Sequence, residues 1–167
     1  MVDDDSGVFF RVGVGAVITN LSFDKVLLFR RSDYMDTWQC PQGGLNQHES
    51  TDEAVFREVF EETGIEKEEL EVVAVCPVWL GYDLPEVKNK SYLGAGQVHR
   101  WYVLKLLTSY DIFRDTTANE FIDASWYSFD GWTLNGVPSF KKEAVSFLMN
   151  WFFDVALSAS GGSLSVL

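Results

Sequence analysis

Three glutamates between residues 43 and 65 have the type and spacing to hold a metal ion. Glu58, Glu61 and Glu62 occupy positions i, i+3 and i+4, so on a helix they share one face within about a 100° arc. Like charges at this spacing repel one another and weaken an exposed helix. Mg²⁺ binds carboxylate oxygens and keeps water or phosphate oxygens in its remaining positions. The pattern indicates a divalent-cation site, with a solvated acidic face as the alternative.

The segment that must position these glutamates is a helix whose two ends can be located. Ser50 followed by Glu53 is a capping-box pattern, in which both side chains satisfy free amides of the first turn. Gly64 is the usual left-handed stop. The neighbouring arc of this helix is apolar and must pack inward; it comprises Val55, Phe56, Val59 and Phe60.

The remaining elements predict an α/β domain with a mixed sheet and helices on its faces. Alternating and β-branched runs predict strands at residues 10–18, 25–29, 71–80, 98–107 and 125–129. A second helix is expected from about Pro138, with an inward stripe at Phe140, Ala144, Phe147, Leu148, Trp151 and Val155. We expect one domain over residues 1–157 and a flexible, Ser/Gly-containing tail over residues 158–167.

Composition narrows the classes of function. The chain has 167 residues, 47% of them apolar, with 13 Lys+Arg against 25 Asp+Glu and a formal net charge of −12. A chain this apolar is not disordered, and one this acidic is not expected to bind DNA through a broad basic face or to dock on a membrane. The N-terminus is acidic and no apolar run reaches the length of a membrane span, so we expect a cytoplasmic protein. Cys40 and Cys76 are expected to be two buried, reduced thiols.

The glutamate-rich segment also fits a longer pattern, Gly-x5-Glu-x7-Arg-Glu-aliphatic-x-Glu-Glu-x-Gly-aliphatic. Its fixed positions are Gly43, Glu49, Arg57, Glu58, Val59, Glu61, Glu62, Gly64 and Ile65. This segment resembles the Nudix box of Nudix hydrolases. The resemblance implies an α/β/α sandwich with a mixed sheet, a loop–helix–loop box and a C-terminal helix. It also implies cleavage of a nucleoside diphosphate linked to another group, using water and Mg²⁺, or Mn²⁺ in its place.

The resemblance implies a role for each box residue. Glu61 and Glu62 match the principal metal ligands, and Glu58 matches a carboxylate that holds metal or activates water. Arg57 matches a residue of the catalytic machinery that forms a structural ion pair with Glu49. The backbone at Gly43 is expected to approach the metal, which requires a residue without a side chain.

Segments outside the box resemble one subgroup of the family, which contains the asymmetrical diadenosine tetraphosphate hydrolases and the bacterial RNA 5′-pyrophosphohydrolases. The matching segments are residues 38–44, 79–85, 96–102, 119–126 and 140–141. The resemblance makes Glu120 a further metal ligand or the base. It makes Tyr82 a contact to a base or phosphate. Further expected substrate contacts are Gln42, Arg11, Arg31 and Arg100, and only one of Arg30 and Arg31 can face the cleft because adjacent strand residues point to opposite faces.

Three functions are compatible with these residues. We rank first the hydrolysis of diadenosine tetraphosphate to ATP and AMP, because the net charge of −12 and the lack of a basic C-terminal extension favour a small nucleotide. The alternative is removal of pyrophosphate from triphosphorylated RNA 5′ ends. A catalytically silent nucleotide-binding module is disfavoured because all four carboxylates are present. The sequence leaves open the preferred phosphate number and base, the cellular metal, the oligomeric state and the roles of His48, His99 and the tail.

Overall fold

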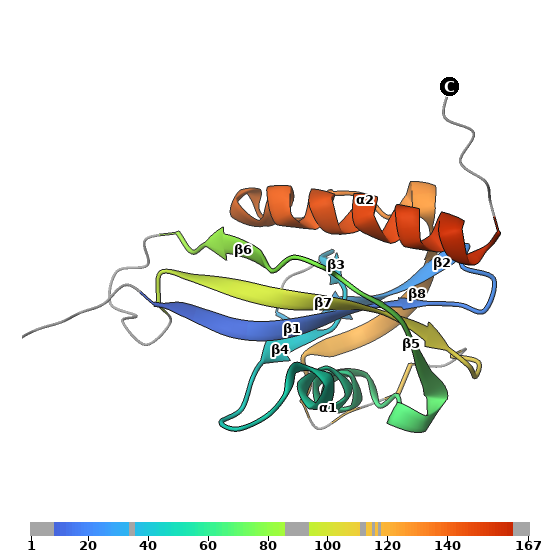
Figure 1. Cartoon of the computed structure of the whole chain (residues 1–167), viewed down its shortest axis with the longest axis horizontal. Coiled ribbons are helices and arrows are strands. Elements are labelled where there is room, and N and C mark those ends of the chain that lie inside the picture. The colour runs from blue at the N-terminus through green and yellow to red at the C-terminus, as the bar shows by residue number, and fades with distance from the viewer. Residues whose placement is uncertain are drawn as a thin grey trace, which may run out of the picture.

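A mixed sheet built around strand β1 (Phe10–Thr19) forms the centre of the molecule (Figure 1). The computed structural model describes residues 9–33, 36–85, 94–110, 113–114, 116 and 118–161. β1 pairs in parallel with β7 (Gly96–Leu106) along its whole length, and antiparallel with β2 (Lys25–Arg31) and β4 (Gln42–Gly44). The β1–β4 pairing places the start of the Nudix-like segment directly on the central strand.

The outer strands extend this sheet in both directions. β3 (Trp38–Gln39) and β8 (Phe121–Ser128) pair with β2, whereas β5 (Leu70–Val75) and β6 (Leu80–Asp83) pair with β7. All four of these pairings are antiparallel, whereas β1 and β7 are parallel, so the sheet is mixed, as predicted.

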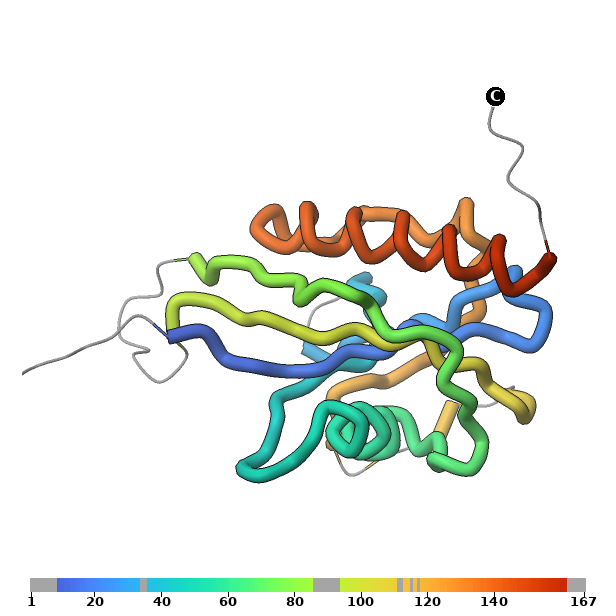
Figure 2. The backbone as a smooth tube through the Cα atoms, viewed as in Figure 1, coloured from blue at the N-terminus to red at the C-terminus, as the bar shows by residue number. Residues whose placement is uncertain are grey.

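One helix covers each face of the sheet, which confirms the predicted α/β/α sandwich (Figures 1 and 2). α1 (Thr51–Thr63) packs on the face that carries Val14 and Ile18, whereas α2 (Lys142–Ala159) packs on the face that carries Val17. Successive residues of a strand point to opposite faces, so β1 supplies both cores. Among the described residues, no helix has the length and apolar character needed to cross a membrane.

α1 has the ends that the sequence predicts. Ser50 is the N-cap and forms a reciprocal capping box with Glu53, and Gly64 closes the helix with a left-handed φ of 70°. Because these caps satisfy free backbone groups locally, they could be identified without any tertiary information.

Other expectations need correction. The strand expected at residues 71–80 is two strands, because the chain leaves the β5 ladder after Val75 and rejoins β7 only at Leu80. β3 and β4 were not predicted, since they are two and three residues long and flank Pro41. Cys40 and Cys76 are buried and free, as expected.

The second helix begins later than predicted, and its inward face agrees with the prediction in part. Ala144, Leu148, Trp151 and Val155 pack against the core as expected, whereas Phe140 lies before the helix. A 3₁₀ turn covers Ser139–Lys141, and α2 then runs to Ala159, two residues beyond the expected end of the domain. Its buried residues are Leu148, Phe152 and Ala156, whereas Phe147 is 46% exposed. Phe152, which the sequence did not predict to face inward, packs edge to face against Phe129 and Trp132.

Replacing Phe152 by Ala should therefore destabilise the protein far more than replacing Phe147 by Ala. Phe152 is fully buried, so its loss leaves a cavity that costs about 3–5 kcal/mol of unfolding free energy. The half-exposed Phe147 should cost about 1 kcal/mol or less. Urea unfolding followed by circular dichroism measures both, and equal losses would refute this orientation of α2.

Candidate active site

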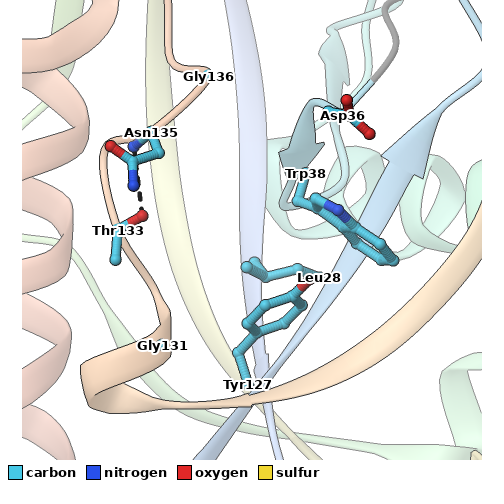
Figure 3. A pocket seen from close by; sticks show the side chains of 8 residues that line it. All are labelled: Leu28, Asp36, Trp38, Tyr127, Gly131, Thr133, Asn135 and Gly136. Atoms are coloured by element: carbon cyan, nitrogen blue, oxygen red, sulfur yellow. Dashed lines mark hydrogen bonds between the residues drawn. The ribbon is translucent and has the colours of Figure 1, made fainter.

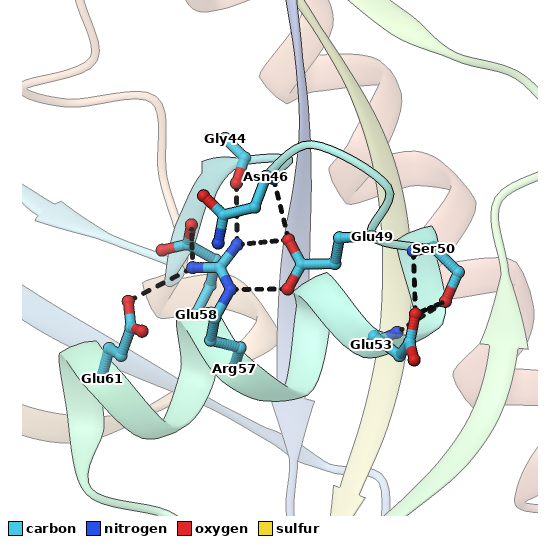
Figure 4. Close-up of polar contacts among 8 residues, drawn as sticks. All are labelled: Gly44, Asn46, Glu49, Ser50, Glu53, Arg57, Glu58 and Glu61. Carbon is cyan, nitrogen blue, oxygen red and sulfur yellow. Dashed lines mark hydrogen bonds and ion pairs between the residues drawn. The ribbon is translucent and has the colours of Figure 1, made fainter.

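The guanidinium of Arg57 joins the loop before α1 to the acidic face of the helix (Figure 4). Nε and Nη2 donate to the two carboxylate oxygens of Glu49 at 2.6 and 2.7 Å, and Nη2 also donates to the Gly44 carbonyl at 2.9 Å. Nη1 reaches Glu58 at 2.8 Å and Glu61 at 3.2 Å. The bidentate contact lowers the pKa of Glu49 to about 2. The expected Glu49–Arg57 ion pair is therefore present, and the same arginine also holds two of the site glutamates.

Glu58 projects from α1 against the backbone of β4. A Cβ atom built on Gly43 would lie 2.1 Å from the Glu58 carboxyl carbon, so only glycine permits this approach. Burial raises the pKa of Glu58, and the hydrogen bond from Arg57 opposes that shift. Position 43 therefore requires glycine, because the Glu58 carboxyl group fills the space that a side chain would take.

Glu62 is the most deeply buried acid of the site, with 3% of its surface exposed. Its Oε2 accepts a hydrogen bond from the backbone N–H of Gln42 at 3.1 Å. Glu120, from the loop before β8, lies close enough to share a hydrogen bond with Glu62. Burial, followed by the negative charges of Glu120 and Glu58, raises the pKa of Glu62 well above its ordinary value. Glu62 and Glu120, far apart in sequence, are therefore neighbours at one buried point.

This set of groups fits a divalent cation chemically. Glu58, Glu62 and Glu120 are crowded oxygen donors whose mutual repulsion a hard cation would relieve. In the described part of the chain, no three acidic, histidine or cysteine side chains already surround a common point. Arg57 forms ion pairs with both Glu58 and Glu61. The Glu61 side chain is half exposed, so Glu61 can change position without disturbing the core.

A cavity of about 500 Å³ opens beside these carboxylates, between the sheet and the start of α2. Its polar lining includes Arg31, Gln42, Gln97 and Lys141, and its apolar lining includes Trp101 and Phe140. Arg31 Nη1 pairs with Glu120 at 3.2 Å, which links the cavity to the acidic cluster. Burial lowers the pKa of Lys141. Sequence reasoning gave no role to Lys141 or Gln97, although both lie in segments that resemble the family.

Tyr82 lies next to this cavity, but its ring and hydroxyl are already engaged. The hydroxyl donates to the Gln97 side chain, and the Gln42 side chain lies within reach of the same oxygen. Lys141 Nζ lies 4.9 Å from the ring centroid, and the His99 ring stacks 6.0 Å away. Burial raises the pKa of Tyr82 to about 12. Tyr82, which we expected to contact a base or phosphate, therefore already contacts several neighbouring side chains in this structure.

The arginines expected to contact substrate lie in different places. Arg31 lines the cavity, while Arg30 pairs with Asp123 at 3.5 Å, which agrees with only one of the two facing the cleft. Arg11 is exposed on β1, and its charge reaches Tyr82 and His99. Arg100 is on the opposite face of β7 from Gln97 and Trp101, with its guanidinium 5.8 Å from the Trp79 ring. The structure thus separates Arg100 from the other expected contacts.

Replacing Glu62 by Gln should remove a pH dependence of stability in the metal-free protein. The pKa of Glu62 is higher in the folded state than its ordinary value of 4.5, so above that pH the folded chain retains a proton that the unfolded chain has lost. Stability therefore falls as pH rises, and Gln, which still accepts from Gln42, should abolish that part of the fall. Thermal unfolding with a chelator from about pH 5 to about pH 9 measures this. Equal slopes for wild type and Glu62→Gln would contradict it, and the exposed Glu68→Gln is the control.

Comparison with known proteins agrees with this geometry. The NUDIX domain family matches residues 9–146. RNA pyrophosphohydrolases from Teredinibacter turnerae and Ectopseudomonas mendocina are 38% and 39% identical to this chain over 148 residues, covering 86% of it and 83% and 89% of their own lengths.

Solved structures share the fold at lower identity. A C. elegans Ap4A hydrolase binary complex superposes with a TM-score of 0.61 at 21% identity, covering 89% of this chain and 98% of its own. The E. coli dihydroneopterin triphosphate pyrophosphohydrolase has a TM-score of 0.62 at 21% identity, covering 84% and 98%. With a family match over most of its length and relatives of this similarity, the chain belongs to the Nudix family of hydrolases.

Proposed function

We propose that this protein hydrolyses a pyrophosphate bond at the triphosphorylated 5′ end of RNA. The observation that supports the hydrolytic chemistry is the contact of buried Glu62 with Glu120, with the charge of Glu58 acting on Glu62, beside a cavity lined by two cationic side chains. The relatives at 38–39% identity, which are named RNA pyrophosphohydrolases, support the RNA end over the dinucleotide that we ranked first from net charge.

Local charge explains why the net charge of −12 is a weak argument against an RNA end. Arg31 and Lys141 both line the cavity, and Arg11 is exposed on the neighbouring strand β1. An enzyme that acts on an RNA terminus needs cations only where the terminal phosphates sit. Arg31 pairs with Asp33 at 2.6 Å and with Glu120 at 3.2 Å, so its charge is already balanced locally. Binding of terminal phosphates would therefore depend mainly on Lys141 and Arg11.

The residues of the site have different roles in the proposed reaction. Glu58, Glu61, Glu62 and Glu120 would hold Mg²⁺, which when bound neutralises phosphate charge and lowers the pKa of a water molecule. The Glu58 carboxyl group is oriented by Arg57 and its pKa is raised by burial, so Glu58 is the residue that we expect to accept a proton from water. Arg31 and Lys141 would orient the phosphates from the cavity side.

Diadenosine tetraphosphate is the second candidate substrate. The strongly acidic surface favours it, because a small nucleotide gains nothing from a broad basic face. The acidic cluster and the cavity would serve either substrate, since both contain a chain of phosphates joined to a nucleoside.

A competition assay separates the two substrates. The protein is given equal concentrations of a short 5′-triphosphate RNA and diadenosine tetraphosphate with Mg²⁺, and products are resolved by chromatography. We expect pyrophosphate release from the RNA with the higher kcat/KM. Prompt formation of ATP and AMP, with the RNA untouched, would reverse the assignment.

Glu61→Gln should lower turnover by orders of magnitude while leaving the fold intact. The amide keeps the shape of the side chain but removes the charge that a divalent cation requires. Exposed Glu68 lies outside the site, so Glu68→Gln is a matched control and should retain full turnover. Steady-state kinetics and circular dichroism measure both variants, and near-normal turnover in Glu61→Gln would remove Glu61 from the metal site.

Tyr82→Phe tests whether Tyr82 positions the site or stacks on a base. The hydroxyl contacts Gln97 and lies beside Gln42, whose backbone N–H holds Glu62. Its loss should lower kcat about tenfold with little change in KM. If the ring stacked on a base instead, Tyr82→Phe would be near normal and Tyr82→Leu would raise KM.

A further inference from the structure

Glu120 belongs to the acidic cluster but is not carried by α1. It lies at the end of the loop between β7 and β8, more than fifty residues after Glu62 in the sequence. Contacts outside the box must therefore place it beside Glu62. Two sets of contacts hold the described part of this loop, one to β2 and one to the carboxyl end of α1.

The contacts to β2 fix the end of the loop from which Glu120 projects. β8 pairs antiparallel with β2, and the Leu28 and Tyr127 side chains of these two strands pack in the same core (Figure 3). Directly before β8, the Ser32 backbone N–H donates to the Glu120 carbonyl and the Ser32 hydroxyl donates to the Asn119 carbonyl, both at 2.8 Å. These contacts place the backbone of Glu120 relative to β2, whereas its position relative to α1 depends on the rest of the loop.

Arg114 joins the middle of the same loop to the carboxyl end of α1. Its Nη1 and Nη2 donate to the two carboxylate oxygens of Glu69 at 2.6 and 2.8 Å, and Nη1 also donates to the Gly64 carbonyl at 2.9 Å. A Cβ atom built on Gly64 would lie 3.1 Å from the Arg114 Cβ atom, so the loop lies directly against this glycine. Because residues 60–63, the last turn of α1, include no basic residue, Arg114 supplies the positive charge that the carboxyl end of a helix favours.

Glu69 binds the loop at two points. Its carboxylate accepts from Arg114 and from the Thr108 hydroxyl at 2.7 Å, and its backbone carbonyl accepts from the Leu107 N–H at 2.8 Å. The Glu66 N–H donates to the same carboxylate at 2.9 Å. These contacts, above all the hydrogen bond from Arg114, lower the pKa of Glu69 to about 2, so Glu69 is ionised at neutral pH.

Two hydroxyl groups of the loop also contact the last turn of α1. The Tyr110 hydroxyl donates to the Thr63 carbonyl at 2.9 Å, and the Thr116 hydroxyl donates to the Glu62 carbonyl at 3.4 Å. Thr116 therefore contacts the backbone of the residue whose carboxylate contacts Glu120. Through these contacts the loop follows the end of α1 up to the acidic cluster.

We propose that the Arg114–Glu69 ion pair positions Glu120 as a metal ligand, by holding its loop against the carboxyl end of α1. This inference rests on the proposed function, since it takes Glu62 and Glu120 to hold the cation together. The charges of these two carboxylates repel one another, so contacts elsewhere must oppose their separation. Arg114 is a positioning residue in this scheme, because it acts on the cation only through Glu120.

Direct titration with Mn²⁺, in the absence of substrate, measures this effect apart from catalysis. Arg114→Gln and Glu69→Gln should each weaken Mn²⁺ binding about tenfold, as is typical when a contact that orients a metal ligand is lost. Lys67→Gln is the matched control and should bind as wild type does. It also removes one positive charge beside the end of α1, and exposed Lys67 lies against Phe56 of α1. Equal Mn²⁺ affinities in all four proteins would overturn the proposal.

Combination with Glu120→Gln separates positioning from a general loosening of α1. Glu120→Gln alone should weaken Mn²⁺ binding, and adding Arg114→Gln should then have little further effect, because the ion pair acts through Glu120. A further tenfold loss in the double variant would show that Arg114 only stabilises the helix. If Arg114→Gln does not fold, Glu69→Gln in the same background provides the same comparison.

Steady-state kinetics link the titration to the reaction. At limiting Mg²⁺, Arg114→Gln should lower kcat about tenfold with little change in the KM for triphosphate RNA, and raised Mg²⁺ should restore most of the loss. If the variants lose Mn²⁺ affinity as expected but wild type cleaves no triphosphate end, the proposed function fails and the positioning role stands. If wild type cleaves the RNA and Arg114→Gln and Glu69→Gln bind Mn²⁺ normally, the positioning role fails and the function stands.

Discussion

The guanidinium of Arg57 is the contact on which the site depends. Its donors fix the loop through Glu49 and Gly44, and the same group holds Glu58 and Glu61 on the helix. An arginine presents five N–H donors in a rigid plane, so one side chain can set several carboxylates at once. The β1–β4 pairing then holds Gly43 beside Glu58 and the Gln42 amide beside Glu62. Loop, helix and central strand thus converge on one small volume.

Burial and repulsion within that volume prepare it for a cation. A protein normally avoids a buried carboxyl group with acidic neighbours, because the charged form is poorly solvated there. This unfavourable burial of the charged form raises the pKa of Glu62. Arg31 and Lys141 lie on the cavity side, and Arg31 pairs with Glu120 of the acidic cluster.

Features set by local physics could be predicted from the sequence, and features set by packing could not. The ends of α1 follow from Ser50, Glu53 and Gly64, and the resemblance to the family identified Glu120 as a partner of the box. Most of the inward stripe of α2 follows from its periodicity, but the burial of Phe152 against Phe129 and Trp132 involves residues from elsewhere in the chain. Strand alternation separates Arg100 from Gln97 but does not say which face carries the cavity. The engaged ring of Tyr82 is likewise visible only in three dimensions.

The parallel pairing of β1 with β7 has a consequence for how the protein is made. Phe10 pairs with Gly96 and Thr19 with Lys105, so the central ladder joins segments that are synthesised far apart in time. Closing so long a loop costs entropy before any contact is gained, which slows folding. Glu120 and Lys141 are synthesised later still. A nascent chain therefore carries its complete box helix well before it has a cavity to serve, and activity should appear only once nearly the whole chain has folded.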